Sequence, residues 1–213
     1  EYLALFKESG NSVFYCFDRS KHLAPIPPPE EYEDIHCSID FNVDKQCTGF
    51  FVVRGDQIQY FDEHQGSPDT YTLAEYISKK YDNGKRNVYA YPDPTGKNRS
   101  TKAVVGVTDF TILKGKGIKV LARLHVPTID SVNAVNRKLM TASGKASLFF
   151  DPTGCPELIR SVERTKWVEG NKDIAMIDKT EDIEHFSDGV RYAVDYLFPV
   201  RDDHVSIAKG TNF

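Results

Sequence analysis

Three aspartates, widely separated in the chain, are placed where they could share divalent cations. Asp40 lies inside the strand-like run Ser38–Val43, Asp93 ends the run Val88–Asp93, and Asp188 stands early in the last helical segment. Two-metal cleavage of a phosphodiester needs carboxylates that converge from different elements, because two cations about 4 Å apart share oxygen ligands. We therefore expect these three residues to be catalytic metal ligands around two ions.

Each of the first two aspartates has an alternative interpretation. Asp40 sits in an apolar strand, where burying an acid is unfavourable unless it is paired or binds a cation. It could instead point to the solvent side of that strand. Asp93 lies at the carboxyl end of a buried-looking strand, where α/β sheets tend to place their sites. Its Pro-Asp-Pro-Thr-Gly surroundings would also explain an ordinary turn aspartate.

His185 precedes Asp188 by three positions, so both side chains fall on one helix face and can address one site. The alternative is that the two residues form an exposed surface pair. Two further acids have structural interpretations. Asp109 is expected to cap or complement a helix start, and Asp195 shares the face of Asp188 and could be structural.

Basic residues stand near the predicted acids and are candidates for contacts with nucleic-acid phosphates. Lys97, Arg99 and Lys102 follow Asp93 closely, and Lys179 precedes His185. Solvated surface positions are the alternative for all four. The Gly-Lys pair at positions 96 and 97 does not belong to a nucleotide-binding P-loop, because the required first glycine and the serine or threonine after the lysine are missing.

The composition indicates a globular chain. Of the 213 residues, 40% are hydrophobic and 12% are aromatic, which is enough for a substantial core. A net charge of −4 disfavours a protein whose whole surface binds DNA, while leaving room for local basic patches. No stretch has the length of a membrane span or the pattern of a signal peptide, so we expect a soluble, non-secreted protein. The four cysteines have no zinc-site spacing and are expected to be reduced thiols.

The order of predicted elements indicates an α/β fold with a central mixed sheet, three antiparallel strands followed by parallel strands, flanked by helices. This is the RNase H-like order. Strands are expected at 36–44, 49–54, 57–63, 86–91, 119–124 and 146–150. Helices are expected at 72–81, 108–113, 129–140, 155–166 and 181–198. Residues 34–213 are predicted to form this domain.

Residues 1–33 are predicted to be an arm that precedes the domain. Two apolar runs, Tyr2–Phe6 and Ser12–Phe17, could be strands. The proline-rich run Ala24–Pro29 excludes helix and favours an extended connector. We interpret the arm as a linker from an upstream domain of a longer polypeptide.

Several segments together resemble the C-terminal nuclease domain of the large terminase subunit of tailed bacteriophages. The resemblance covers about 35–200 and rests on Ser38–Asn42, Tyr91–Gly96, Arg99–Thr101, Ile129–Asn136 and His185–Tyr192. It implies an endonuclease that cuts concatemeric double-stranded viral DNA during packaging with little sequence preference. It also implies that Asp40, Asp93 and Asp188 ligate Mg²⁺ or Mn²⁺, with His185 as an auxiliary group.

The same resemblance implies partners and a location. The upstream domain would be the ATPase of the same polypeptide, and the small terminase subunit and the portal would be further partners. Such a protein would act in the host cytoplasm, without a membrane, and would be absent from the mature virion.

Other interpretations remain open at this stage. Another RNase H-like nuclease, such as a Holliday-junction resolvase or a transposase core, would place its acids similarly. The domain could also be a non-catalytic DNA-binding or docking module of the packaging motor. A sugar-kinase-like domain is disfavoured, because no glycine-rich phosphate hairpin follows Asp40.

Overall fold

The computed structural model describes residues 11–41, 46–97, 107–123, 126–168 and 176–200. Predictions that fall on Tyr2–Phe6, Arg99 and Lys102 lie outside these ranges. Among the described helices, none combines the length and apolar character needed to cross a membrane.

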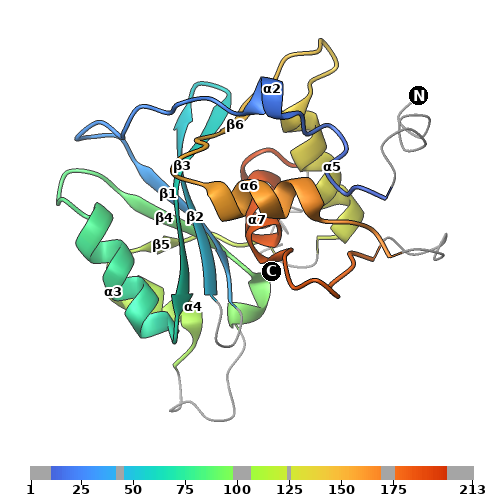
Figure 1. Ribbon diagram of the computed structural model, residues 1–213. Coiled ribbons are helices and arrows are strands. Elements are labelled where there is room, and N and C mark those ends of the chain that lie inside the picture. Colours follow the sequence, from blue (N-terminus) through green and yellow to red (C-terminus); the bar gives the residue numbers. More distant parts are fainter. Residues whose placement is uncertain (1–10, 42–45, 98–106, 124–125, 169–175, 201–213) are drawn as a thin grey trace, which may run out of the picture.

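A six-stranded mixed sheet forms the centre of the molecule, in the order β5-β4-β1-β2-β3-β6 (Figure 1). The first three strands along the chain pair antiparallel, and β4, β5 and β6 pair parallel to their neighbours. The predicted mixed α/β sheet is thereby confirmed. The bounds are β1 Ile35–Asp40, β2 Gln46–Arg54, β3 Gln57–Ser67, β4 Val88–Pro92, β5 Lys119–Val120 and β6 Leu148–Phe150.

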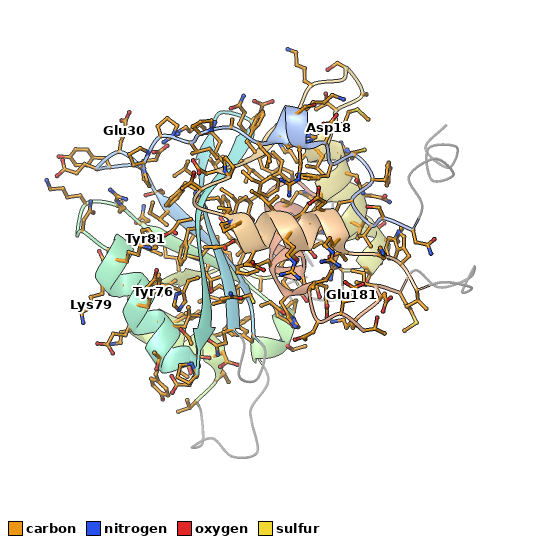
Figure 2. All side chains as sticks on the ribbon, in the orientation of Figure 1. Asp18, Glu30, Tyr76, Lys79, Tyr81 and Glu181 are labelled. Atoms are coloured by element: carbon orange, nitrogen blue, oxygen red, sulfur yellow. The ribbon has the colours of Figure 1, made fainter. Side chains whose placement is uncertain are left out.

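Helices cover both faces of this sheet (Figure 1). One face carries α3 (Thr70–Tyr81) and α4 (Asp109–Gly115). On the other face lie α5 (Thr128–Leu139), α6 (Pro156–Arg164) and α7 (His185–Leu197). In Figure 2, Tyr76 and Tyr81 of α3 are directed toward the sheet and Lys79 away from it, consistent with the burial of Tyr81 and the exposure of Lys79.

The alternation of β1 decides which residues face which layer. Ile35, Cys37 and Ile39 belong to the core under α3 and α4, and all three are fully buried. Side chains alternate between the two faces of a strand, so Asp40 projects to the opposite face, where α7 packs. The alternation of β1 therefore places apolar side chains in the core under α3 and α4, and the Asp40 carboxylate on the face that α7 covers.

The segment before the sheet packs onto the domain. Val13 and Phe14 are fully buried in the core formed with α5, α6 and α7. The predicted strand at Ser12–Phe17 is wrong, because the chain makes tight turns there, with one isolated bridge from Ser12 to Lys166. A four-residue helix follows, α2 (Arg19–His22), capped by Asp18. The interpretation of residues 1–33 as an arm from another domain stays a prediction.

The other elements agree with the predictions in type and order, with shifted ends. The last helix starts at His185 rather than at position 181, since Asp182 adopts a left-handed backbone with φ of 53°. The strand expected at 119–124 is limited to two residues. All four cysteines, Cys16, Cys37, Cys47 and Cys155, are free and buried.

Candidate functional site

Two of the predicted aspartates are brought together by the pairing of β1 with β4. Asp40 is the last residue of β1, and Asp93 directly follows β4, which runs parallel to β1. The backbone N–H of Asp93 donates a hydrogen bond of 3.0 Å to the carbonyl of Ile39. Both carboxylates therefore stand at the carboxyl end of the sheet, on neighbouring strands.

Asp93 also serves the turn in which it lies. Its Oδ1 accepts a hydrogen bond of 2.7 Å from the backbone N–H of Thr95, at the start of the short 3₁₀ helix η1 (Pro94–Lys97). The side chain is half-buried. Asp93 thus has the turn role expected from its proline- and glycine-rich surroundings, and it also lies beside Asp40.

The helix α7 supplies the other half of the site by lying very close to β1. A Cβ atom at Gly189 would come within 3.3 Å of the backbone carbon and oxygen of Ser38. This close approach places the first turn of α7 above the end of β1. The result is a hydrogen bond of 3.0 Å between His185 Nδ1 and Asp40 Oδ2.

Burial and neighbouring charges act on Asp40 in opposite directions. Burial raises the pKa of the Asp40 carboxyl above its usual range, its hydrogen bond with His185 opposes this, and the nearby carboxylates of Asp188 and Asp93 add to the rise in pKa. Hydrogen bonding to Asp40 raises the pKa of His185 to about 9, against the effect of burial. His185 is thus a cation at neutral pH, and it offsets charge in a crowded acidic site.

Asp188 is buried and is held by two cations on different oxygens. Arg191, one turn further along α7, donates to Asp188 Oδ1 from Nε at 3.1 Å and from Nη2 at 2.7 Å. Lys179 Nζ lies 3.4 Å from Asp188 Oδ2. The sequence interpretation missed Arg191, although its spacing of three from Asp188 is one at which helical side chains meet.

Glu184 is a second residue that the sequence interpretation missed, because an acid just before a helix is usually solvated. Its side chain is buried, and Oε2 has no hydrogen-bond partner among the described residues. Oε1 lies 3.6 Å from Lys179 Nζ. Buried carboxylate oxygens are expected to be paired or to bind cations, so Glu184 adds to the local demand for positive charge.

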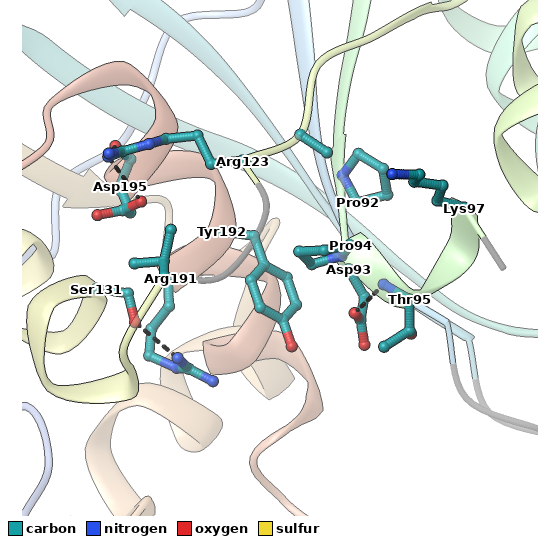
Figure 3. A pocket seen from close by; sticks show the side chains of 12 residues that line it. Pro92, Asp93, Pro94, Thr95, Lys97, Arg123, Ser131, Arg191, Tyr192 and Asp195 are labelled. Carbon is teal, nitrogen blue, oxygen red and sulfur yellow. Dashed lines mark hydrogen bonds and ion pairs between the residues drawn. The ribbon is translucent and has the colours of Figure 1, made fainter. Parts of the chain in front are cut away.

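A cavity of about 360 Å³ opens beside Asp93, the one of the three candidate aspartates that lines it. Figure 3 shows the ring of Tyr192 in this cavity between Arg191 on one side and Asp93 on the other. The remaining lining comes from these residues: Pro92, Pro94, Thr95, Lys97, Ala122, Arg123, Val126, Ser131 and Asp195. Asp195 pairs with Arg123 at 3.1 Å, which agrees with the structural role expected for it.

The placement of the predicted ligands does not by itself complete a metal site. In the described part of the chain, no three His, Cys, Asp and Glu side chains lie close enough together to hold one ion. Their chemistry fits, since hard divalent cations take carboxylate oxygens. Protein cations contact the carboxylates of Asp40 and Asp188 in this arrangement. The assignment of the three aspartates as ligands stays a prediction.

The remaining predicted residues are placed as follows. Lys97 is exposed at the rim of the cavity, and the Lys179 side chain is 64% exposed. Asp109 accepts a hydrogen bond of 2.6 Å from the Thr70 hydroxyl at the first turn of α4. Its expected structural role at a helix start is compatible with this contact.

The order of the sheet, three antiparallel strands joined by parallel ones, is that of the RNase H-like fold. Solved structures of phage large terminases share this fold. A large terminase from a thermophilic bacteriophage, in complex with ATP-γ-S, matches with a TM-score of 0.67 and 21% identity, over 88% of this chain and 46% of that chain. This chain thus spans less than half of that large terminase.

Isolated nuclease domains match along most of their length. The large terminase nuclease of thermophilic phage G20c with bound magnesium matches with a TM-score of 0.59 and 12% identity, over 87% of this chain and 97% of that chain. The nuclease domain of the bacteriophage SPP1 large terminase with bound Mn matches with 0.52 and 15%, over 78% and 87%. No protein-family model and no curated protein sequence matches the chain.

Proposed function

We propose that this domain is a divalent-metal-dependent endodeoxyribonuclease of the large-terminase type, which cuts concatemeric double-stranded DNA during viral genome packaging. One observation carries the proposal. The β1–β4 pairing and the close approach of α7 gather Asp40, Asp93 and Asp188 at one end of an RNase H-like sheet. The fold shared with terminase nuclease domains, including ones with bound magnesium and Mn, supports it.

The metal ligands would be Asp40, Asp93 and Asp188, with Asp40 between the other two. Bound Mg²⁺ or Mn²⁺, as a pair of ions, would activate a water and stabilise the leaving 3′-oxygen. Asp40 stands between Asp93 on the sheet and the first turn of α7, so it would contribute to holding both ions. His185, hydrogen-bonded to Asp40, would orient that carboxylate and stabilise its charge.

Lysine and arginine side chains around the acids would hold the DNA backbone. Lys97 stands at the rim of the cavity, next to Asp93. Lys179 is exposed beside Asp188. We propose both as phosphate contacts, together with Arg99 and Lys102, which the sequence places just beyond Lys97. Contacts of this kind position DNA without reading its sequence, which suits cleavage with little sequence preference.

The partners follow from the same proposal. The domain would act beside an ATPase domain of the same polypeptide, as the partial coverage of the ATP-γ-S-bound large terminase suggests. The small terminase subunit and the portal would complete the packaging machine, in the cytoplasm of the infected host.

A plasmid-cleavage assay tests the function. We expect purified protein to nick and linearise supercoiled DNA with Mn²⁺ or Mg²⁺, and to be inactive with EDTA. Asp40→Asn should abolish cleavage, whereas Asp82→Asn, on the surface after α3, should leave it unchanged. If the Asp40→Asn protein cleaved the plasmid as fast as the wild type, the assignment of Asp40 as a catalytic metal ligand would be wrong.

Two further measurements separate the alternatives. A four-way junction cut faster than linear duplex would favour a resolvase. The contacts of Asp40 and Asp188 with protein cations are the observation behind the second candidate, a non-catalytic module. Failure of the wild-type protein to bind Mn²⁺ in solution would support that second candidate.

A further inference from the structure

The two oxygens of Asp188 are held in different ways. Oδ1 receives both Nε and Nη2 of Arg191, and the remaining Nη1 donates to the Ser131 hydroxyl of α5 at 2.7 Å. Arg191 and Asp188 are both almost fully buried. The Ser131 hydroxyl is bonded in turn to the Thr128 carbonyl at 2.9 Å. A chain of hydrogen bonds therefore anchors one oxygen of Asp188 to the first turn of α5.

The contact on the other oxygen is of a different kind. Lys179 reaches Asp188 Oδ2 at 3.4 Å from outside α7, with a side chain that is 64% exposed. It also lies 3.6 Å from Glu184 Oε1. Lys179 thus makes two long contacts from an ammonium that is largely in water, so it can give way to another cation without leaving a buried charge of its own. The buried guanidinium of Arg191, in contrast, cannot be exchanged readily for another cation.

We infer that Arg191, anchored on Ser131, is a positioning residue: it occupies Oδ1 of Asp188 and so leaves Oδ2 as the oxygen that can bind the metal ion. Lys179 neutralises Oδ2 until the metal ion binds and displaces it. This inference rests on the proposed function, because it concerns the metal ligand Asp188. Hydrogen-bonded partners of metal ligands fix the ligand's orientation, and their loss weakens metal affinity by about 10–100-fold.

The test is direct Mn²⁺ binding, measured by calorimetry on the whole chain without DNA, together with the thermal midpoint of each variant. Arg191→Lys keeps the charge but cannot contact Asp188 and Ser131 at once, and should weaken Mn²⁺ binding about 10–100-fold. Ser131→Ala, which keeps Arg191, should weaken it less. Lys179→Met removes the competing cation and should strengthen binding about tenfold.

Arg54→Lys is the matched control, because Arg54 also pairs with a carboxylate through Nε and Nη2, that of Glu33 at 2.7 and 2.8 Å, and does not line the site cavity. It should lower stability similarly while leaving the Mn²⁺ affinity unchanged. The inference would be overturned if the Arg191→Lys and Ser131→Ala proteins both fold and bind Mn²⁺ as tightly as the wild type. It would also be overturned if Lys179→Met bound Mn²⁺ more weakly than the wild type. A wild-type protein that binds no Mn²⁺ would overturn the proposed function as well, so the two failures are distinguishable.

Discussion

Individual side chains at the carboxyl end of the sheet are arranged as acid–cation pairs. Asp40 meets His185, and Asp188 meets Arg191 and Lys179. Position in the sequence, together with the resemblance to terminase nuclease domains, pointed to Asp40 and Asp188, and the resemblance added His185; their catalytic roles stay predictions. Arg191 and Glu184 were missed, because a helical arginine and a helix-start glutamate are mostly solvated surface residues. The burial of Arg191 arises from the packing of α7 against α5, which no local pattern shows.

His36 is a half-buried histidine of β1 outside the acid cluster, and its partial burial makes stability depend on pH. It stacks on Phe51 and Tyr89 and hydrogen-bonds to the Tyr91 hydroxyl at 2.9 Å. Burial lowers the pKa of His36 to about 4, whereas an unfolded histidine titrates near ~6.5. The neutral ring is thus favoured in the folded state. Its contribution is complete above pH ~6.5 and is lost as the pH falls toward about 4.

We therefore expect the free energy of unfolding of the wild-type protein to fall between pH 7 and pH 5. His36→Gln should be less stable at pH 7 but should lose less stability over that interval. Urea unfolding at several pH values measures both slopes. Equal slopes for the two proteins would contradict the assignment of this pH dependence to His36.

At the level of elements, the contact between α7 and β1 depends on a glycine. The Cβ of an alanine at Gly189 would sit 3.3 Å from the backbone of Ser38. Gly189→Ala should push α7 outward by a few tenths of an ångström and destabilise the protein by about 1–3 kcal/mol. It should also weaken Mn²⁺ binding, because His185 and Asp188 move with the helix.

Gly115→Ala is the matched control for this change. Gly115 is the last residue of α4. A Cβ added there would have no atom within 4 Å apart from its chain neighbours and the backbone of its own helix. Alanine has the higher helix propensity, so the control should be neutral or slightly stabilising. Thermal unfolding and calorimetry compare the pair, and equal effects of the two substitutions would show that the close approach of α7 does not position the site.

Element types could be predicted because hydrophobic period and turn residues are local signals. The helix over Thr70–Tyr81 and the strand over Val88–Pro92 show this directly. The prediction failed at Ser12–Phe17, where an apolar run filled the core from tight turns instead of a strand. Apolar content predicts burial there, but strand formation needs a neighbouring strand edge, which depends on the whole fold.

For the molecule as a whole, the segment before the sheet is part of the folded unit. Phe14 is 1% exposed within the core of α5, α6 and α7. Phe14→Ala should lower the free energy of unfolding by about 3–5 kcal/mol, in a single transition monitored by both tryptophan fluorescence and circular dichroism. Tyr32→Ala, at a side chain that is 70% exposed, should change stability by less than about 0.5 kcal/mol. Two separate transitions would contradict a single cooperative unit.

The register of β1 with β4 has a mechanical consequence. Asp40 and Asp93 are joined through the backbone hydrogen bond between Asp93 and Ile39, so they travel together with the sheet. Asp188 travels with α7 instead. The position of Asp188 relative to the other two carboxylates therefore depends on how α7 lies over the two strand ends. Any force applied along α7, even far from its first turn, would tune the span between Asp188 and the other two carboxylates.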